Sequence, residues 1–88
     1  MSDSDDLFKF PCRFPIKAMG LAHEDIKGFL LSVLKIHGAT PHPDDLVSRL
    51  SGQGKYISVT ATIHATSRGQ LDAIYTALSQ DQRIRYVL

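Results

Sequence analysis

Apolar and polar residues alternate along four stretches of the chain, at the period of two that sends successive side chains to opposite faces of a β-strand. Residues 55–65 show this best, because one face carries only apolar side chains: Ile57, Val59, Ala61 and Ile63. Residues 13–19 and 83–88 follow the same rule, and residues 46–50 follow it more weakly. The pattern therefore predicts four strands.

The first and last of these stretches also indicate which side chains share a face. In residues 13–19, the apolar face holds Phe14, Ile16 and Ala18. Pro15 lacks an amide donor, which confines it to an edge strand or to the start of a strand, and we expect Gly20 to end the strand. In residues 83–88, the alternation predicts one face with Ile84, Tyr86 and Leu88, and another with Arg83, Arg85 and Val87.

Apolar residues recur every three or four positions over residues 23–37, which predicts a helix. Glu24 and Asp25 are expected in its first turn, where acidic groups favour the helix dipole. Gly38 follows as a stop signal. Gly28, inside the helix, predicts close packing of the helix on the sheet.

A second helix is expected from Thr66 or Ser67 to about Gln80. Ser67 and Gln70 have the spacing of a reciprocal capping box. Its apolar stripe holds Leu71, Ile74, Tyr75 and Leu78. Residues 40–45 have the composition of a loop, and residues 51–54 that of a hairpin turn between the second and third strands.

The predicted order is strand, helix, strand, strand, helix, strand. Right-handed crossovers place both helices on the same side of the sheet. The fold class is therefore α+β: a ferredoxin-like βαββαβ two-layer sandwich, with a four-stranded antiparallel sheet and two helices on one face. We expect one such domain over residues 8–88 and a flexible acidic tail over residues 1–7.

Charge is unevenly distributed along the chain of 88 residues, whose formal net charge is +1. Asp3, Asp5 and Asp6 lie in the predicted tail. Without them, ten Lys and Arg remain against six Asp and Glu, so the predicted domain is mildly basic. We find neither the pattern of a signal peptide nor an apolar stretch for a membrane helix, and expect a cytoplasmic protein without a membrane partner.

Candidate catalytic and metal-binding residues are few. Cys12 is the only cysteine, which excludes an internal disulfide and any multi-cysteine metal site. The loop expected after the first strand has neither the Cys-x-x-Cys pair of a metal carrier nor the glycine-rich cradle and arginine of an acylphosphatase-like enzyme. The four histidines lack a cluster of further ligands. The residues therefore predict a non-enzyme with no cofactor and no metal.

RNA binding is the alternative function, because a common RNA-recognition domain shares this topology. That domain stacks bases on aromatic side chains of its central strands, whereas here Tyr56 is the only aromatic residue of the strongest strand. Contacts on the open side of the sheet would come from Lys17, Tyr56, Thr60, Arg83 and Arg85. Sparse aromatics and mild charge disfavour nucleic acid as the partner.

Several motifs resemble the YbeD-like family of small bacterial proteins of uncharacterised function. They are Phe10-Pro11, residues 14–20 (FPIKAMG), the Ser-x-x-Gly-x-Tyr-x-Ser pattern of residues 51–58, and the terminal Val87-Leu88. The resemblance implies a ferredoxin-like fold similar to ACT regulatory domains, which bind amino acids or other small effectors at dimer interfaces. By this resemblance, the effector or interface positions would be Met19, Gly20, Leu21 and His23.

We therefore expect a non-catalytic regulatory or protein-interaction module that forms a homodimer and binds a protein partner or a small-molecule effector. The open side of the sheet is either the interface or a solvated surface. The residues identify neither the partner nor the effector.

Overall fold

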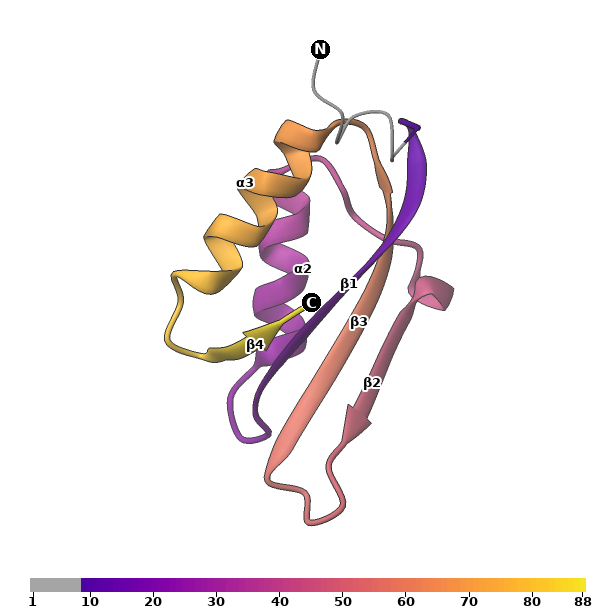
Figure 1. Ribbon diagram of the computed structural model, residues 1–88. Helices are drawn as coiled ribbons and strands as arrows, with labels where there is room; N and C mark the ends of the chain where they lie inside the picture. Colours follow the sequence, from indigo (N-terminus) through magenta and orange to yellow (C-terminus); the bar gives the residue numbers. More distant parts are fainter. Residues whose placement is uncertain (1–8) are drawn as a thin grey trace.

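The computed structural model describes residues 9–88, so the predicted tail over residues 1–7 lies outside the described residues. Four strands form one antiparallel sheet in the order β2-β3-β1-β4. Both helices cover the same face of it (Figure 1). The elements are β1 Cys12–Leu21, α2 Ile26–Ile36, the short 3₁₀ helix η1 Pro43–Asp45, β2 Leu46–Leu50, β3 Tyr56–Ala65, α3 Arg68–Ser79 and β4 Ile84–Val87. The predicted ferredoxin-like fold is confirmed.

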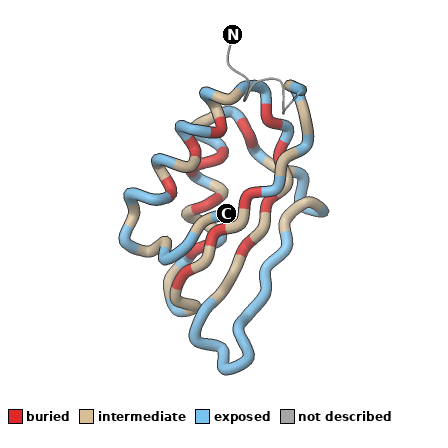
Figure 2. The backbone as a smooth tube through the Cα atoms, viewed as in Figure 1, coloured by how far each residue is buried: buried red, intermediate tan, exposed pale blue. Residues whose placement is uncertain are grey.

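The hydrophobic core lies between the helices and the helix-facing side of β1 and β3 (Figure 2). The sheet contributes the side chains predicted by the alternation: Ile16, Ala18, Val59, Ala61 and Ile63. The helices contribute Ile26, Leu30, Leu34, Leu71, Ile74 and Leu78, all nearly inaccessible to solvent. The period-two and period-3.6 patterns therefore identified the core correctly.

The prediction that Gly20 ends the first strand is wrong, because β1 continues through Gly20 to Leu21. Gly20 is buried. A Cβ placed there would collide with the backbone oxygen of Arg83 and with the side chain of Ile26. Gly20 therefore lacks a side chain because β1 lies very close to the segment before β4 and to α2 at this position.

Pro15 lies in the central strand β1, at a position where only β3 is described as pairing with it. Lys17 exchanges two backbone hydrogen bonds with Leu88, at 3.1 and 2.8 Å. Because the backbone groups of a strand alternate in direction, the nitrogen of Pro15 points to the same side as that of Lys17. Pairing between β1 and β4 is described no further than Lys17, so Pro15 interrupts no described ladder and acts as a local edge residue.

The first helix starts later than predicted, at Ile26 rather than at residue 23. Asp25 is its N-cap, and its carboxylate accepts a hydrogen bond from the amide of Gly28 at 2.9 Å. Asp25 therefore precedes the first turn instead of lying in it, and Glu24 lies outside the helix. A Cβ at Gly28 would meet the Asp25 carboxylate, so this glycine makes room for the cap and not for the sheet.

The second helix has the predicted cap, with one difference. The hydroxyl of Ser67 accepts a hydrogen bond from the amide of Gln70 at 3.1 Å. Gln70 reaches back to the amide of Thr66, at 2.8 Å, rather than to that of Ser67. Its side-chain nitrogen also donates to the carbonyl of His37 at 2.9 Å. One side chain therefore joins the start of α3 to the end of α2.

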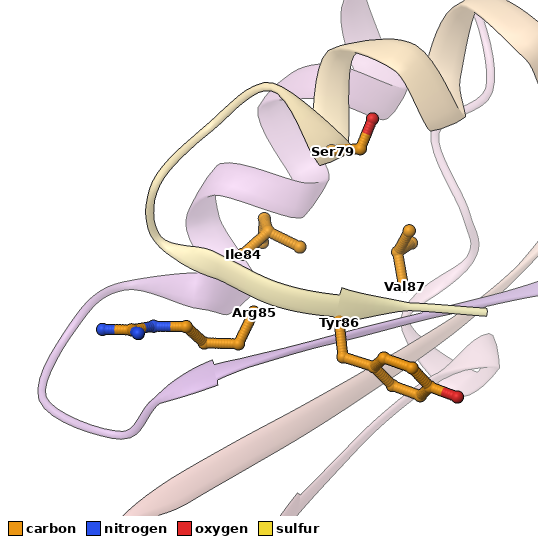
Figure 3. A pocket seen from close by; sticks show the side chains of 5 residues that line it. All are labelled: Ser79, Ile84, Arg85, Tyr86 and Val87. Atoms are coloured by element: carbon orange, nitrogen blue, oxygen red, sulfur yellow. The ribbon is translucent and has the colours of Figure 1, made fainter.

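Tyr86 and Leu88 share a face as predicted, but the predicted grouping of Ile84 with them is wrong, because a bulge interrupts the alternation. Ala18 pairs with Val87 and Met19 with Tyr86, but the next residue, Gly20, pairs with Ile84. Arg85 is the extra residue. Ile84 and Val87 consequently both point toward the helices, whereas Tyr86 points to the opposite side (Figure 3).

The hairpin of β2 and β3 extends beyond the helical layer (Figure 1). Its turn contains Gly54 at a φ of 73°, a left-handed conformation that favours glycine. Four of the five residues of β2 are exposed, so this edge strand is open to solvent on both faces. Among residues 9–88, no helix is long and apolar enough to cross a membrane.

Candidate functional site

The side of the sheet away from the helices, here called the open face, displays a mixture of cationic, apolar and hydroxyl side chains. Strand alternation places them there. They are Arg13, Pro15, Lys17, Met19, Leu21, Val47, Arg49, Tyr56, Ser58, Thr60, Thr62, His64, Tyr86 and Leu88. Both helices pack on the opposite face of the sheet, and among the described residues no helix covers the open face.

The register brings the open-face side chains into two rows that cross all four strands. From β2 to β4, the first row consists of Val47, Thr60, Lys17 and Leu88. The second row consists of Arg49, Ser58, Met19 and Tyr86. Neighbours in a row lie about 5 Å apart. Each row thus combines one cation, one hydroxyl group and two apolar or aromatic groups within one contact area.

Apolar exposure is concentrated on this face. Six large hydrophobic residues of the described chain are exposed, and four of them belong to the open face: Val47, Tyr56, Tyr86 and Leu88. The other two are Ile36 on α2 and Leu50 on β2. Tyr86 and Leu88 are neighbours at the end of the chain, whereas Thr60 and Lys17 separate Val47 from them, so the exposed apolar side chains are distributed across the whole face. Several exposed apolar side chains on one face mark it as a candidate interaction surface.

The cations of the open face differ in whether an acid neutralises them. Arg13 forms an ion pair with Asp45 at 2.8 Å, and its hydrogen bond lowers the pKa of the Asp45 carboxyl. Neither Lys17 nor Arg49 has an acidic partner within residues 9–88. The ammonium group of Lys55 lies over the Tyr56 ring, 5.4 Å from its centre. The open face therefore carries two cations without an acidic partner among the described residues, Lys17 on the central strand β1 and Arg49 on the edge strand β2.

A shallow hollow of about 280 Å³ lies between β1, the start of β3 and the end of β2. We call it the basic hollow; its lining residues are Lys17, Met19, Arg49, Leu50, Ser51, Tyr56 and Ser58. Ser51 is held in place, because its hydroxyl accepts a hydrogen bond from the Tyr56 amide at 3.1 Å. The hollow combines an apolar floor with two cations.

Two of the five residues predicted for open-side contacts, Lys17 and Tyr56, meet in the basic hollow. Thr60 lies beside Lys17 in the first row. Arg83 lies elsewhere: it forms an ion pair with Asp81 at 2.9 Å and covers the ring of Phe29 at 4.1 Å from its centre. Hydrogen bonds from Arg83 lower the pKa of Asp81 to about 2. Arg83 therefore fastens the loop before β4 to α2.

Arg85, the fifth predicted contact, is the exposed bulge residue of β4. It lines a separate hollow of about 240 Å³ together with Ser79, Ile84, Tyr86 and Val87 (Figure 3). Arg85 has no ion-pair partner within the part of the chain that the structure describes. It is not among the residues of the basic hollow.

The four positions suggested for an effector do not form one loop. Met19, Gly20 and Leu21 belong to β1. Met19 and Leu21 lie on the open face, while Gly20 is buried. His23 lies exposed in the turn before α2. At the start of α2, the amide of Gly28 already donates to the chain's own Asp25 carboxylate.

Sequence reasoning missed Arg49, Val47, Tyr86 and Leu88 as open-face residues. Val47 and Arg49 are two residues apart and therefore share a face of β2, but nothing in the sequence aligned β2 with β3 and β1. For Tyr86 and Leu88, the face depends on the β4 bulge, which carries no signature in residues 83–88. Cys12 is half-buried and packs against the core, and residues 9–88 contain no group of three side chains suited to a metal ion.

Comparison with known proteins identifies a family. The sequence profile of a family described as "Protein of unknown function (DUF493)" matches residues 5–88. A UPF0250 protein of Janthinobacterium sp. (strain Marseille) is 40% identical over 88 residues, which cover 100% of this chain and 97% of the relative. A UPF0250 protein of Chromobacterium violaceum is 40% identical over 89 residues, covering 100% of both chains. No solved structure matches. The chain therefore belongs to the DUF493 family of bacterial UPF0250 proteins, as the YbeD-like motifs predicted.

Proposed function

We propose that the protein is a non-catalytic interaction module that binds a protein partner on the open face of its sheet. The observation that carries this proposal is the gathering there of four of the six exposed large hydrophobic residues. Aromatic residues are enriched at the energetic centres of protein interfaces. Tyr56 and Tyr86 supply them here.

Charge indicates the kind of partner. Lys17 and Arg49 lie in the two rows without an acidic neighbour among residues 9–88. A second copy stacked face to face would bring like charges together, which is unfavourable in an interface. A segment with acidic and apolar side chains would satisfy both the cations and the apolar group. We therefore propose an acidic, amphipathic segment of another protein as the occupant.

The partner surface is tested by capture of tagged protein from cells, comparing wild type with the double variant Val47→Ser/Tyr86→Ser. We expect the partner to be recovered with wild type and to be lost with the double variant. Ile36→Ser is the matched control, because Ile36 is 78% exposed on the helical side. The recovered protein is then purified and its Kd measured; we expect at least about a tenfold weakening with the double variant. Equal Kd values for wild type and double variant would contradict the proposal.

RNA remains a second candidate, because Tyr56 and Tyr86 share the open face with Lys17 and Arg49. Stacking on two aromatic side chains is a recognised mode of single-stranded RNA binding. RNase treatment of the lysate before capture separates the two candidates. A partner retained after RNase favours protein docking, whereas loss of all captured material favours RNA.

We further propose that the protein forms a homodimer through the free edge of β2. The backbone groups of Val47 and Arg49 point toward β3 and form the hydrogen bonds of the ladder. This follows from the hydrogen bond that the Ser51 amide donates to the Tyr56 carbonyl at 2.9 Å, because backbone groups two residues apart point to the same side. The backbone groups of Ser48 and Leu50 consequently face outward. An antiparallel copy centred on Ser48 would place Leu46 opposite Leu50 of the second copy. This pairing covers an exposed edge strand, which otherwise invites association.

The edge pairing predicts that Ser48→Pro is monomeric. Proline removes the outward Ser48 amide, which by symmetry supplies both central hydrogen bonds, while the ladder to β3 uses other residues. Ser48→Thr keeps the donor and is the control. Light scattering at tens of micromolar should give twice the chain mass for wild type and Ser48→Thr, and the chain mass for Ser48→Pro. A monomeric wild type, or a dimeric folded Ser48→Pro, would disprove β2 pairing.

Metabolite sensing stays a prediction of the family resemblance. Next to His23, one of the suggested effector positions, the start of α2 has Asp25 as its cap and Glu24 beside it. Both acids oppose an incoming anion. We therefore assign binding to the open face rather than to this turn.

A further inference from the structure

We propose that the basic hollow is a specific site for a carboxylate carried on a small aliphatic group. The inference rests on the open face being the binding surface, and it names the chemistry that the centre of this surface recognises. It combines three observations: the position of the two uncompensated cations, the apolar lining between them, and the size of the hollow.

The two cations bracket the hollow. Lys17 on β1 and Arg49 on β2 lie on either side of Ser58 of β3, because Met19, Ser58 and Arg49 form one row and Lys17 is two residues from Met19. Strand geometry puts their Cα atoms roughly 12 Å apart, a separation that two long side chains can bridge around one anion. An anion placed between them would meet both positive charges, since neither has an acidic partner among residues 9–88.

The anion is best a carboxylate attached to an apolar body. Arg49 offers a planar fork that matches a carboxylate, and Lys17 adds a point charge. Met19 and Tyr56 line the same hollow and provide apolar surface for a short aliphatic chain. Methionine adapts its shape to such a ligand at little cost. A bare phosphate would leave this apolar surface exposed.

Size restricts the ligand further. The hollow measures about 280 Å³, just below the roughly 300–1,000 Å³ of pockets that enclose drug-sized ligands. It therefore accommodates a group about as large as a leucine side chain with its carboxylate. Two sources carry this chemistry: a free branched-chain acid, and the terminal carboxylate of a partner chain that ends in an aliphatic residue.

The test is an NMR titration of the full chain with 4-methylpentanoate, and with its neutral analogue 4-methylpentanamide, at 50 mM salt. We expect the acid to shift the amide signals of Met19, Ser51 and Ser58, with a Kd on the order of 1 mM, and the amide to cause no saturable shift. Because Arg49 is exposed and Lys17 is only half-buried, Arg49→Gln and Lys17→Gln should each weaken binding about threefold, and together about tenfold. Arg85→Gln is the control and should bind as wild type does.

A second arm distinguishes the sources, using acetyl-Gly-Gly-Leu with a free or an amidated terminus. Tighter binding of the free peptide than of 4-methylpentanoate supports a partner terminus; the reverse order supports a free acid. Equal binding of acid and amide, or an Arg85→Gln effect as large as that of Arg49→Gln, would overturn the proposal. Val47 and Tyr86 lie outside the basic hollow, so failure here leaves the capture experiment on the open face independently decisive.

Discussion

Gly20→Ala is expected to lower the free energy of unfolding by about 3 kcal/mol, at the upper end of the usual cost of overpacking. The added methyl group would collide with the backbone oxygen of Arg83 and with the side chain of Ile26. A side chain can rotate away, but the oxygen belongs to the segment that leads into β4 and is held by the Arg83–Asp81 ion pair. The substitution should therefore displace β4 from β1.

Gly52→Ala is the matched control, since a Cβ there meets nothing within 4 Å. Its unfolding free energy should stay within about 0.5 kcal/mol of the wild-type value. Urea denaturation followed by circular dichroism measures both variants. If Gly20→Ala proved as stable as Gly52→Ala, the close approach of Gly20 to the backbone of Arg83 would be contradicted.

Leu30→Ala is expected to cost roughly 2–5 kcal/mol, because it removes a fully buried side chain from the interface between α2 and the sheet. The loss combines the transfer free energy of the deleted methyl and methylene groups with the cavity that remains. The surrounding layer contains Ile16, Val59 and Leu34, all 0% exposed. A core of this size has few other side chains that could move into the gap.

Ile36→Ala on the same helix provides the comparison. Ile36 is 78% exposed, and alanine is the better helix former, so the variant should match or slightly exceed wild-type stability. Thermal and urea unfolding of the two variants should differ clearly. Similar losses for Leu30→Ala and Ile36→Ala would mean that the helix packs through a different face.

Local patterns predicted the fold because the periodicity of apolar residues indicates which side of each strand or helix faces the core. Ile57, Val59 and Ile63 alternate with polar residues, and the observed bounds of β3, Tyr56–Ala65, nearly equal the predicted residues 55–65. One error arose where a tertiary contact overrides the local pattern: a side chain at Gly20 would collide with the backbone of Arg83, and this glycine lies inside β1. The other error is local, since Asp25 is a cap rather than a first-turn residue and its carboxylate accepts a hydrogen bond from the amide of Gly28.

The candidate site was less predictable because it depends on register. Lys17 and Tyr56 were recognisable as residues of the polar strand faces. Their convergence with Arg49 requires the alignment of three strands, two of which are far apart in sequence. The position of Tyr86 on the face opposite to Ile84 depends on the bulge at Arg85, and no spacing within residues 83–88 indicates it.

The order of the strands also constrains how the chain folds. β1 is made first during synthesis, yet both of its partners, β3 and β4, come later in the sequence. Only the β2–β3 hairpin forms from local contacts. The pairings of β1 with β3 and of β1 with β4 each close a long loop, because both partners are distant from β1 in the sequence. Such non-local pairing slows folding relative to helical bundles of similar length. Until β3 and β4 are both available, β1 has unpaired backbone groups, and an unpaired strand edge of this kind favours association with other chains.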